Sequence, residues 1–444
     1  MTAVSGSACS TQHNAGDLSP IHWQTTRGVP RCCAAVLDAL KFTTVSLGSL
    51  SSWNEDDWKQ ALDFCDSSQL TLLTANACRG GLPSWVAERT RRNLDANVTR
   101  LEQLQREYLQ IARGFEAASV EHVVLKGFAQ APWFVSDLRL RPQYDLDLWC
   151  PENQLPMAQR VLTQLGFQSI TAQGRFPTDH LPPMVRKTGW EWRGDYFDLE
   201  IPPVVELHFR LWDEATERFA APGLEPFWTR RRRQQLAQET IPVLHPADQF
   251  AFATLHVLRH LLRGNLKALH VYEIAHFLDK RQGDAEFWNE WRELHPARLR
   301  ELQTLACCLA GKWFACGLPA AVAAEINRLR PELRVWFESY AACAVESKFR
   351  AAKDELWLHL ALLPSFKDRI AVVRRRMIPL TLPGRVDSAF VPDEQRTMAR
   401  RMRGAVQHAF ATGSRVIYHL RSCGPVLRGA VGWLRQRCHR TPKM

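Results

Sequence analysis

Residues 144–150, with the sequence YDLDLWC, decide how the middle of the chain folds. Polar and apolar residues alternate along this stretch, which is the pattern of a β-strand with one buried face. Asp145 and Asp147 are two positions apart and therefore project from the same face of the strand. Two carboxylates held together in this way can bind one or two divalent cations, and Mg²⁺ (or Mn²⁺) suits such oxygen ligands. The stretch therefore predicts a metal site.

The segments on either side of this strand predict a small α/β unit. HVVLK at 122–126 reads as a short buried strand that ends at Gly127, and VVELHF at 204–209 reads as another strand. Residues 154–165 have a helical pattern that stops at Gly166, and glycine favours helix C-termini. Because strands and helices alternate here while the flanking regions are helical, we expect an α+β fold.

A third carboxylate from a neighbouring strand would complete the metal site. Glu206 is our candidate, because its strand is short and apolar, as expected for a central strand beside the first. Glu206 shares one face of that strand with His208. Asp198 and Glu200 also alternate in the stretch YFDLE, residues 196–200, and either of them is an alternative third acid.

Three residues upstream of the acids are candidates for binding a phosphate group: Lys126, Gly127 and Arg141. Lys126 and Gly127 end one strand and open a helical segment, so the backbone N–H groups at this point could receive a phosphate. The positive charge of Lys126 or Arg141 would add to this attraction. Lys126 and Gly127 are therefore expected at the rim of the cleft that holds the acids.

Helical periodicity dominates on both sides of the α/β unit. Apolar residues recur every three or four positions between Pro83 and Glu116, which predicts one long amphipathic helix. We divide the chain into five parts: a flexible leader at 1–30, a helical region at 31–116, the core at 117–245, a helical domain at 246–373 and a basic segment at 374–444.

The positive charge of the chain is concentrated near its C-terminus. The formal net charge is +11 over 444 residues, and the segment after residue 373 holds 15 Lys and Arg against 3 Asp and Glu. Arginines alternate with apolar residues over 393–438, which predicts a pair of basic amphipathic helices. We expect them to bind an anionic membrane surface or nucleic acid, and to be separable from the chemistry. A solvated surface is the alternative.

Two negative features of the sequence favour a cytoplasmic protein. No run approaches the ~18 uncharged apolar residues of a membrane-spanning helix, and the first residues lack the pattern of a signal peptide. The 12 cysteines form no CxxC motif and no regular framework, as suits free thiols in a reducing compartment.

Several short motifs follow one another in a characteristic order. They are LKG at 125–127, RPQYDLDL at 141–148, LGF at 165–167, ELHF at 206–209, and a helical region with His256, His260 and EIA at 273–275. In this order the chain resembles, over roughly residues 50–380, the family of uncharacterised bacterial nucleotidyltransferases of the polymerase-β-like superfamily.

The resemblance implies a polymerase-β-like nucleotidyltransferase core with a mixed sheet, flanked by N-terminal and C-terminal helical regions. It also implies a metal-dependent reaction that moves an NMP group from an NTP to an acceptor hydroxyl. The acceptor would be a small molecule, a peptide or a glycan precursor. Carried over, Asp145, Asp147 and Glu206 are the metal-binding acids, and Lys126-Gly127 stands in for the usual phosphate-binding Gly-Ser turn. Arg141 would join Lys126 and Gly127 in binding the triphosphate. The chain departs from the family pattern at three residues, Tyr144, Phe209 and Glu273, and Tyr144 could narrow the nucleotide pocket.

Other functions are compatible with parts of the same sequence. The fold could serve as a non-catalytic nucleotide-sensing or interaction module, against which the presence of all three acids argues. The basic segment could make the chain an RNA-binding protein, although it carries few aromatic residues and no RNA-binding signature. His256 and His260, one helical turn apart, could bind zinc, but no third ligand lies nearby in sequence.

Overall fold

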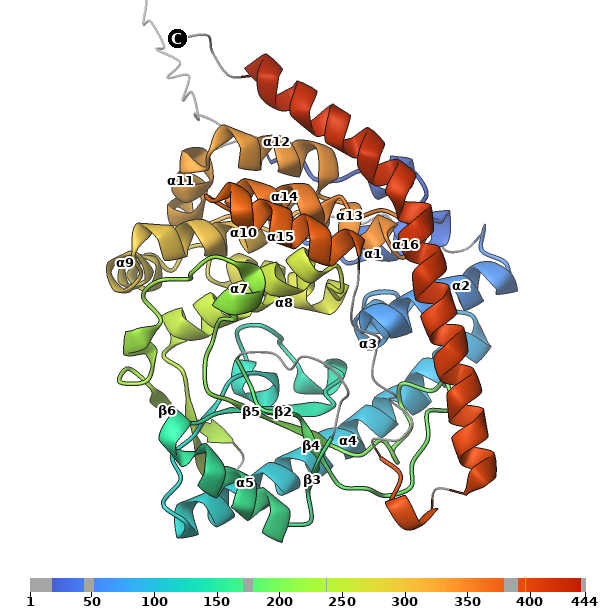
Figure 1. Ribbon diagram of the computed structural model, residues 1–444, viewed down its shortest axis with the longest axis vertical. Coiled ribbons are helices and arrows are strands. Elements are labelled where there is room, and N and C mark those ends of the chain that lie inside the picture. The colour runs from blue at the N-terminus through green and yellow to red at the C-terminus, as the bar shows by residue number, and fades with distance from the viewer. Residues whose placement is uncertain are drawn as a thin grey trace, which may run out of the picture.

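A mixed β-sheet lies in one half of the molecule, and a bundle of helices forms the other half (Figure 1). The computed structural model describes residues 18–43, 52–170, 179–236, 238–378, 390–395 and 397–440. Within them the sheet has the strand order β3-β4-β5-β2-β1-β7-β6. The strands are β1 Val123–Val124, β2 Asp145–Trp149, β3 Gln168–Ser169, β4 Met184–Val185, β5 Val204–His208, β6 Arg232–Leu236 and β7 Glu239–Val243. The expected α+β class is confirmed.

Strand β2, formed by the stretch that opens the sequence analysis, lies at the centre of the sheet. It pairs in parallel with β5 and antiparallel with β1. The register with β5 places Asp147 opposite Glu206 and Trp149 opposite His208. The expected neighbouring strand therefore lies beside β2, and its acid lies directly beside Asp147.

Helices α4 (Ser84–Ala117) and α5 (Leu155–Gln164) cover the apolar face of the sheet. The long helix predicted between residues 83 and 116 is thus α4. Apolar residues of α4 and the sheet form one core, whose members include Tyr108, Phe115, Leu146, Leu148, Val205 and Leu207. Since side chains alternate along a strand, Asp145, Asp147 and Glu206 project from the opposite face.

The helical half contains helices from both ends of the chain. Its members are α1 Arg31–Ala39, α2 Glu55–Ser68, α3 Thr71–Ala77, α7 Pro246–Arg263, α8 Ala268–Lys280, α9 Ala285–Leu294, α10 Ala297–Phe314, α11 Ala320–Arg328, α12 Pro331–Tyr340, α13 Cys343–Glu346, α14 Glu355–Leu362 and α15 Phe366–Met377. Helices α1, α2, α7, α8 and α10 share one continuous core. The regions before and after the sheet, which the sequence analysis separates, therefore pack as one body.

The expected flexible leader at 1–30 is wrong for its second half. Trp23 is fully buried, and its Nε1 donates to the carbonyl of Trp313 at 3.1 Å. The backbone N–H of Ile21 also donates to the carbonyl of Lys312 at 2.8 Å. An apolar anchor that contacts a residue 290 positions away is not visible as local periodicity. Residues 1–17 lie outside the described residues.

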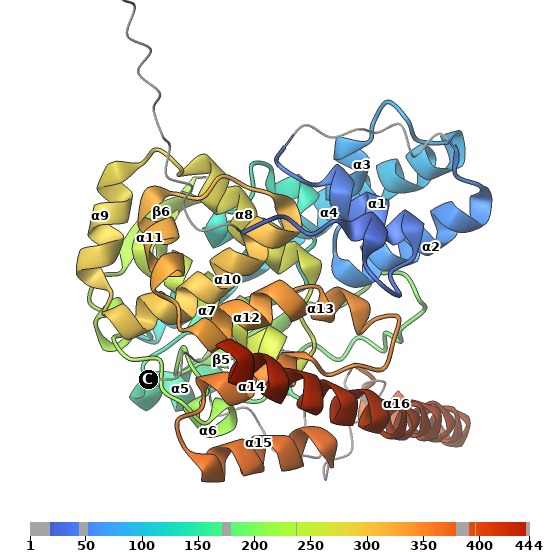
Figure 2. The ribbon, with the colours of Figure 1, turned by 90° about the horizontal axis from the view of Figure 1, so that it is seen from above.

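The basic segment forms one helix, α16 (Met398–Arg440), instead of the expected pair. It continues through Pro425, although an interior proline costs about 3 kcal/mol, because packing holds the helix on both sides of this residue. Val426 and Trp433 are buried, and Tyr418 donates its hydroxyl to the carbonyl of Ala352 at 2.6 Å. Figures 1 and 2 show α16 passing along the outside of the helical half.

Helix α16 also reaches the sheet half, where Arg400 Nε pairs with Glu191 at 3.2 Å. It is therefore attached to both halves, contrary to the expectation of a separable tail. Among the described helices, none is long and apolar enough to cross a membrane.

Candidate active site

The sheet positions the three predicted acids on one of its faces, toward α7 and α8, and we name this site the acid cleft. Asp145 and Asp147 come from β2, and Glu206 comes from the parallel strand β5 at the same level as Asp147. The Asp147 side chain is 1% exposed, whereas those of Glu206 and Asp145 keep 24% and 41% of their surface exposed. Asp147 thus forms the floor of the cleft, and Asp145 faces its opening.

Two basic side chains contact these acids. Lys126 Nζ lies 3.0 Å from Asp147 Oδ1 and 3.9 Å from Asp145 Oδ2. His208 Nε2 lies 3.0 Å from the same Asp147 oxygen and 3.6 Å from Glu206 Oε2. Lys126, which the sequence analysis expects at the rim, therefore reaches into the acid cluster itself. Its ammonium group supplies positive charge between Asp145 and Asp147.

The pKa values of the cluster show how its charges are balanced. Burial alone would raise the pKa of Asp147, but Lys126 and His208 outweigh it and hold that pKa well below its usual range. Burial and the neighbouring charge of Asp147 raise the pKa of Asp145 to about 6. Burial opposes the charged form of His208, yet hydrogen bonds to Asp147 and Glu206 raise its pKa to about 9. Lys126 and His208 thus offset the repulsion among the buried acids, and the pKa of Asp145 alone is raised among the three acids.

The residues of this cleft fit a divalent cation. Asp147, Glu206 and His208 each offer a ligand atom, and within the described part of the chain they are the group of three such atoms that lie within 4.8 Å of one another. Asp147 Oδ2 is buried without a hydrogen-bond partner, so one carboxylate oxygen is free to bind a metal. Asp145 lies outside that group and would approach the cation from the open side, where Lys126 has to move aside.

Gly127 has a structural requirement of its own. Its φ of +70° is unfavourable for other residues, and a Cβ atom there would lie 2.1 Å from the side chain of Gln143. Gln143 in turn donates to the carbonyl of Asp145 at 2.8 Å and so fixes the start of β2. Gly127 itself is buried and begins a 3-10 helix of only four residues, Gly127–Gln130. Its role in phosphate binding stays a prediction.

Arg141 lies deeper than the sequence suggests. Its side chain is 6% exposed, and its Nε pairs with Glu273 Oε1 at 2.6 Å. Glu273 also accepts from His270 at 3.4 Å. The buried ion pair links the segment before β2 to α8. A contact between Arg141 and the triphosphate stays a prediction.

The other predicted or alternative residues are placed clearly by the structure. Asp198 and Glu200 do not lie on a strand, and Asp198 accepts a hydrogen bond from Trp190 Nε1 at 2.9 Å. Glu200 pairs with Arg193 at the surface. Tyr144 turns away from the acids and donates to the carbonyl of Tyr196. These placements favour Glu206 as the third acid.

Three histidines line the side of the cleft formed by α7 and α8. The rings of His256 and His260 are 4.3 Å apart, and that of His270 lies 4.7 Å from His256. His256 Nε2 lies 3.5 Å from Lys126 Nζ. Burial lowers the pKa of all three, which keeps them neutral. They form no metal-binding triad among the described residues, so the structure does not support a zinc site.

Sequence reasoning missed the roles of two residues. The two-residue period of β5 places His208 on the face of Glu206, and this signal would have sufficed to name His208 as a possible metal ligand. Lys267 gives no local signal, since it precedes α8 by one residue and its charge acts on Asp145 from a distant part of the chain.

Comparisons with known proteins agree with this geometry. The model of the family described as uncharacterised nucleotidyltransferase matches residues 54–315, which span α2 to α10 and contain every acid of the cleft. Searches of curated proteins and of solved structures found no match. The matched region covers more than half of the chain. The chain therefore belongs to the family of uncharacterised nucleotidyltransferases.

Proposed function

We propose that the chain transfers an NMP group from an NTP to a hydroxyl of a small-molecule, peptide or glycan-precursor acceptor, using Mg²⁺ or Mn²⁺. The observation that carries this proposal is the convergence of Asp145, Asp147 and Glu206 on one face of the sheet, with a buried Asp147 oxygen left unpaired. In such a reaction the acceptor oxygen bonds to the α-phosphorus, and the bond from that phosphorus to the β-bridging oxygen breaks. Pyrophosphate leaves with the bonding electrons, and the hydroxyl proton passes to water.

The side chains of the cleft would divide the work among them. Asp147, Glu206 and His208 would hold the metal, and Asp145 would complete the site from the open side. A bound divalent cation lowers the pKa of the attacking hydroxyl and neutralises charge on the phosphates. Lys126, once displaced from the acids, carries its charge on a flexible stem toward the triphosphate, with Gly127 and Arg141 at the same end of the cleft. Catalysis then rests on positioning and electrostatic stabilisation.

Asp145→Asn tests the proposal with little risk to the fold, since 41% of the Asp145 side chain is exposed. Asn keeps the shape but removes a charge, so we expect Mg²⁺-dependent NTP turnover to fall by about 10³-fold. Glu200→Gln, a surface acid outside the cleft, is the matched control and should stay within two-fold of the wild type. Equal, metal-independent NTP binding by all three proteins would instead support a non-catalytic nucleotide-sensing module.

We also propose an anionic membrane surface as the partner of α16. Nine exposed apolar side chains lie within about one third of the helix circumference at 100° per residue: Met398, Met402, Val406, Phe410, Val416, Ile417, Leu420, Leu427 and Val431. The buried residues Ser422, Val426 and Trp433 lie on the opposite side. Arg403, Arg421 and Arg428 border the apolar stripe, as in helices that lie in a membrane interface. Nucleic acid would meet this apolar stripe unfavourably.

Co-sedimentation of the full chain with vesicles tests this partner. Vesicles rich in phosphatidylserine should bind the protein at low salt, and Phe410→Glu/Leu420→Glu should abolish binding without loss of the fold, because both side chains are exposed. Arg401→Glu is a control outside the stripe. Binding to RNA in place of vesicles would contradict the assignment, as would equal vesicle binding by the stripe variant.

We place the protein in the cytoplasm, on the evidence of its thiols. All ten cysteines that the structure describes are free, and nine of them are buried. Free thiols of this kind persist in a reducing compartment.

A further inference from the structure

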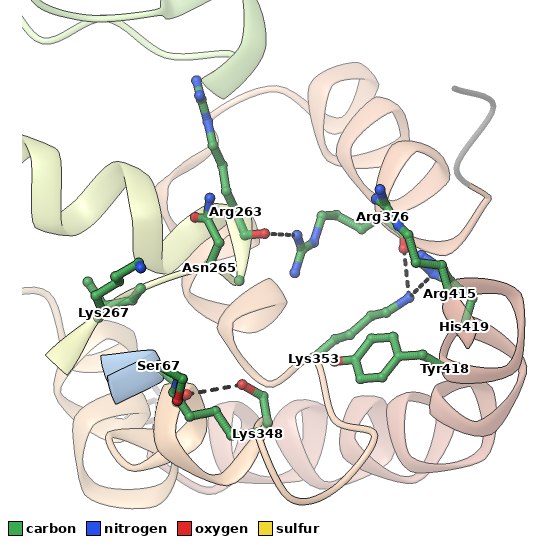
Figure 3. A pocket seen from close by; sticks show the side chains of 14 residues that line it. Ser67, Arg263, Asn265, Lys267, Lys348, Lys353, Arg376, Arg415, Tyr418 and His419 are labelled. Carbon is green, nitrogen blue, oxygen red and sulfur yellow. Dashed lines mark hydrogen bonds between the residues drawn. The ribbon is translucent and has the colours of Figure 1, made fainter. Parts of the chain in front are cut away.

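A cavity of about 380 Å³ lies between the loop that joins α7 to α8 and the helix α16 (Figure 3). Its lining includes Lys and Arg side chains but no Asp or Glu. The basic residues are Arg263, Lys267, Lys348, Lys353, Arg376 and Arg415. They come from four separate parts of the chain, so the fold has collected the charge at one place.

Most of this charge has no acidic partner. Figure 3 shows the guanidinium of Arg263 turned away from the cavity, where it pairs with Asp213 and Glu217. Arg376 pairs with Glu355. The remaining four, Lys267, Lys348, Lys353 and Arg415, form no ion pair with a described carboxylate. The cavity therefore carries an excess of positive charge, which the nearby Glu355 and Asp145 offset only in part.

Two lysines on the α13–α14 side, Lys348 and Lys353, have pKa values that the neighbouring positive charge lowers. Lys353 is 2% exposed, and its Nζ donates to the carbonyl of Arg376 at 2.8 Å and contacts His419 Nδ1 at 2.7 Å. Burial and then the charge of Arg376 lower the pKa of Lys353 to about 8. The residue Lys348 is exposed at its surface, but partial desolvation and then the charge of Lys267 lower its pKa to about 8 as well. An anion in the cavity would relieve this repulsion.

The cavity adjoins the acid cleft without being part of it. None of Lys126, Asp145, Asp147 and Glu206 lines it. Lys267 connects the two, because it lines the cavity while Asp145 acts on its charge. A molecule anchored in the cavity would have to extend past Lys267 to reach the metal-binding acids.

The family match separates the two sites in sequence. All the proposed NTP and metal ligands lie within residues 54–315, the region that matches the family. Lys348, Lys353, Arg376 and Arg415 lie beyond it. The shared chemistry is thus encoded in the matched region, whereas most of the cationic cavity comes from a part of the chain outside it, as expected for recognition of this chain's own acceptor.

We propose that this cavity binds a phosphate group of the acceptor substrate and presents the acceptor hydroxyl to the cleft of Asp145 and Asp147. The assignment rests on the proposed nucleotidyl transfer and names its acceptor class as a phosphorylated compound. Helix α16 would then contribute to acceptor binding as well as to membrane binding, because Arg415, Tyr418 and His419 form one wall of the cavity.

Calorimetric titration of the full chain with inorganic phosphate, in EDTA to keep the metal site empty, tests the cavity. Lys348→Ala/Arg415→Ala should weaken phosphate binding at least ten-fold, and both side chains are exposed, so packing is retained. The control Lys280→Ala/Arg401→Ala removes the same charge outside the cavity and should bind phosphate as the wild type does. No phosphate binding by the wild type, or equal binding by both double variants, would overturn the proposal.

A second titration distinguishes the acceptor from the nucleotide. Binding of a non-hydrolysable NTP with Mn²⁺ should be unchanged in Lys348→Ala/Arg415→Ala and lost in Asp145→Asn. A parallel loss of NTP binding in the cavity variant would assign the cavity to the triphosphate and overturn the acceptor assignment. If Asp145→Asn keeps full NTP binding while phosphate binding still follows the cavity residues, the proposed function fails and the phosphate site stands.

Discussion

The acid cleft and the cationic cavity solve opposite electrostatic problems within one molecule. In the cleft, three carboxylates are brought together by strand pairing, and Lys126 and His208 neutralise them from within. In the cavity, four basic side chains converge from separate segments, and no carboxylate lines the wall. The cleft therefore carries its own counter-charges, whereas the cavity depends on a ligand to supply them.

This difference predicts how each site responds to the loss of one charge. In the cleft the charges are paired and buried, so removing one leaves another without a partner, which is costly. In the cavity the charges repel one another, so removing one relieves strain in the free protein and weakens only the bound state. Loss of a charge in the cleft should therefore lower the free energy of unfolding of the protein, whereas loss of a charge in the cavity should lower its affinity for an anion.

The largest effect on stability is expected for Asp147→Asn. This change leaves Lys126 and protonated His208 without their buried partner, so the free energy of unfolding should fall by about 3 kcal/mol, in addition to the loss of turnover. Urea denaturation measures the difference. Asp145→Asn is the comparison, since its more exposed carboxylate lies 3.9 Å from Lys126, and it should cost under about 1 kcal/mol. Equal losses of unfolding free energy in the two variants would contradict the claim that Asp147 is the buried partner of Lys126 and His208.

The next largest effect, on metal-dependent turnover, distinguishes Glu206 from Asp198 as the third metal-binding acid. Glu206→Gln should lower metal-dependent turnover by about 10²-fold, because the acid lies beside Asp147 in the register of the two strands. Asp198→Asn should lower it less than two-fold, since that side chain accepts from Trp190 outside the cleft. Steady-state kinetics at saturating Mg²⁺ measure the turnover of both variants. A larger loss in Asp198→Asn than in Glu206→Gln would make Asp198 the third acid.

A smaller effect concerns the pH dependence of the cavity. Sulfate keeps its charge between pH 6 and 9, while Lys348 and Lys353 lose theirs as the pH rises through about 8. The thermal stabilisation by sulfate should therefore shrink several-fold from pH 7 to pH 9. The groups that face these two lysines are Lys267, Cys33 and Ser67 around Lys348, and Arg376, Glu355, His419, Tyr418 and Cys423 around Lys353.

The variant Lys348→Ala/Arg415→Ala should show little of this pH-dependent stabilisation and so controls for the general effect of sulfate on proteins. If both proteins respond identically at each pH, the cavity does not bind the anion.

The positions of the acids could be predicted from the sequence, because the alternation of side chains along a strand depends only on neighbouring residues. Alternation fixes which residues of β2 and β5 share a face, and a parallel pairing of these two strands brings Asp147 beside Glu206. The long helix α4 follows from its apolar period in the same way. The fold class and the acids were therefore accessible from the sequence.

The features that escaped prediction depend on contacts between distant segments. Trp23 is buried against Trp313, and the continuity of α16 through Pro425 depends on packing of Val426 and Trp433. The cationic cavity needs Lys267, Lys353 and Arg415 to meet, which no local pattern encodes. Arg141 was predicted from its charge, but its burial against Glu273 is a property of tertiary packing.

The most direct test is the crystal structure of the full chain with Mn²⁺ and a non-hydrolysable NTP, read through the anomalous signal of manganese. Our account predicts an anomalous peak bound by Asp147 and Glu206, with Asp145 completing the site, Lys126 moved off the acids, and the α-phosphate beside the metal. A manganese peak elsewhere, or a nucleotide bound while Lys126 keeps its 3.0 Å contact with Asp147, would contradict it.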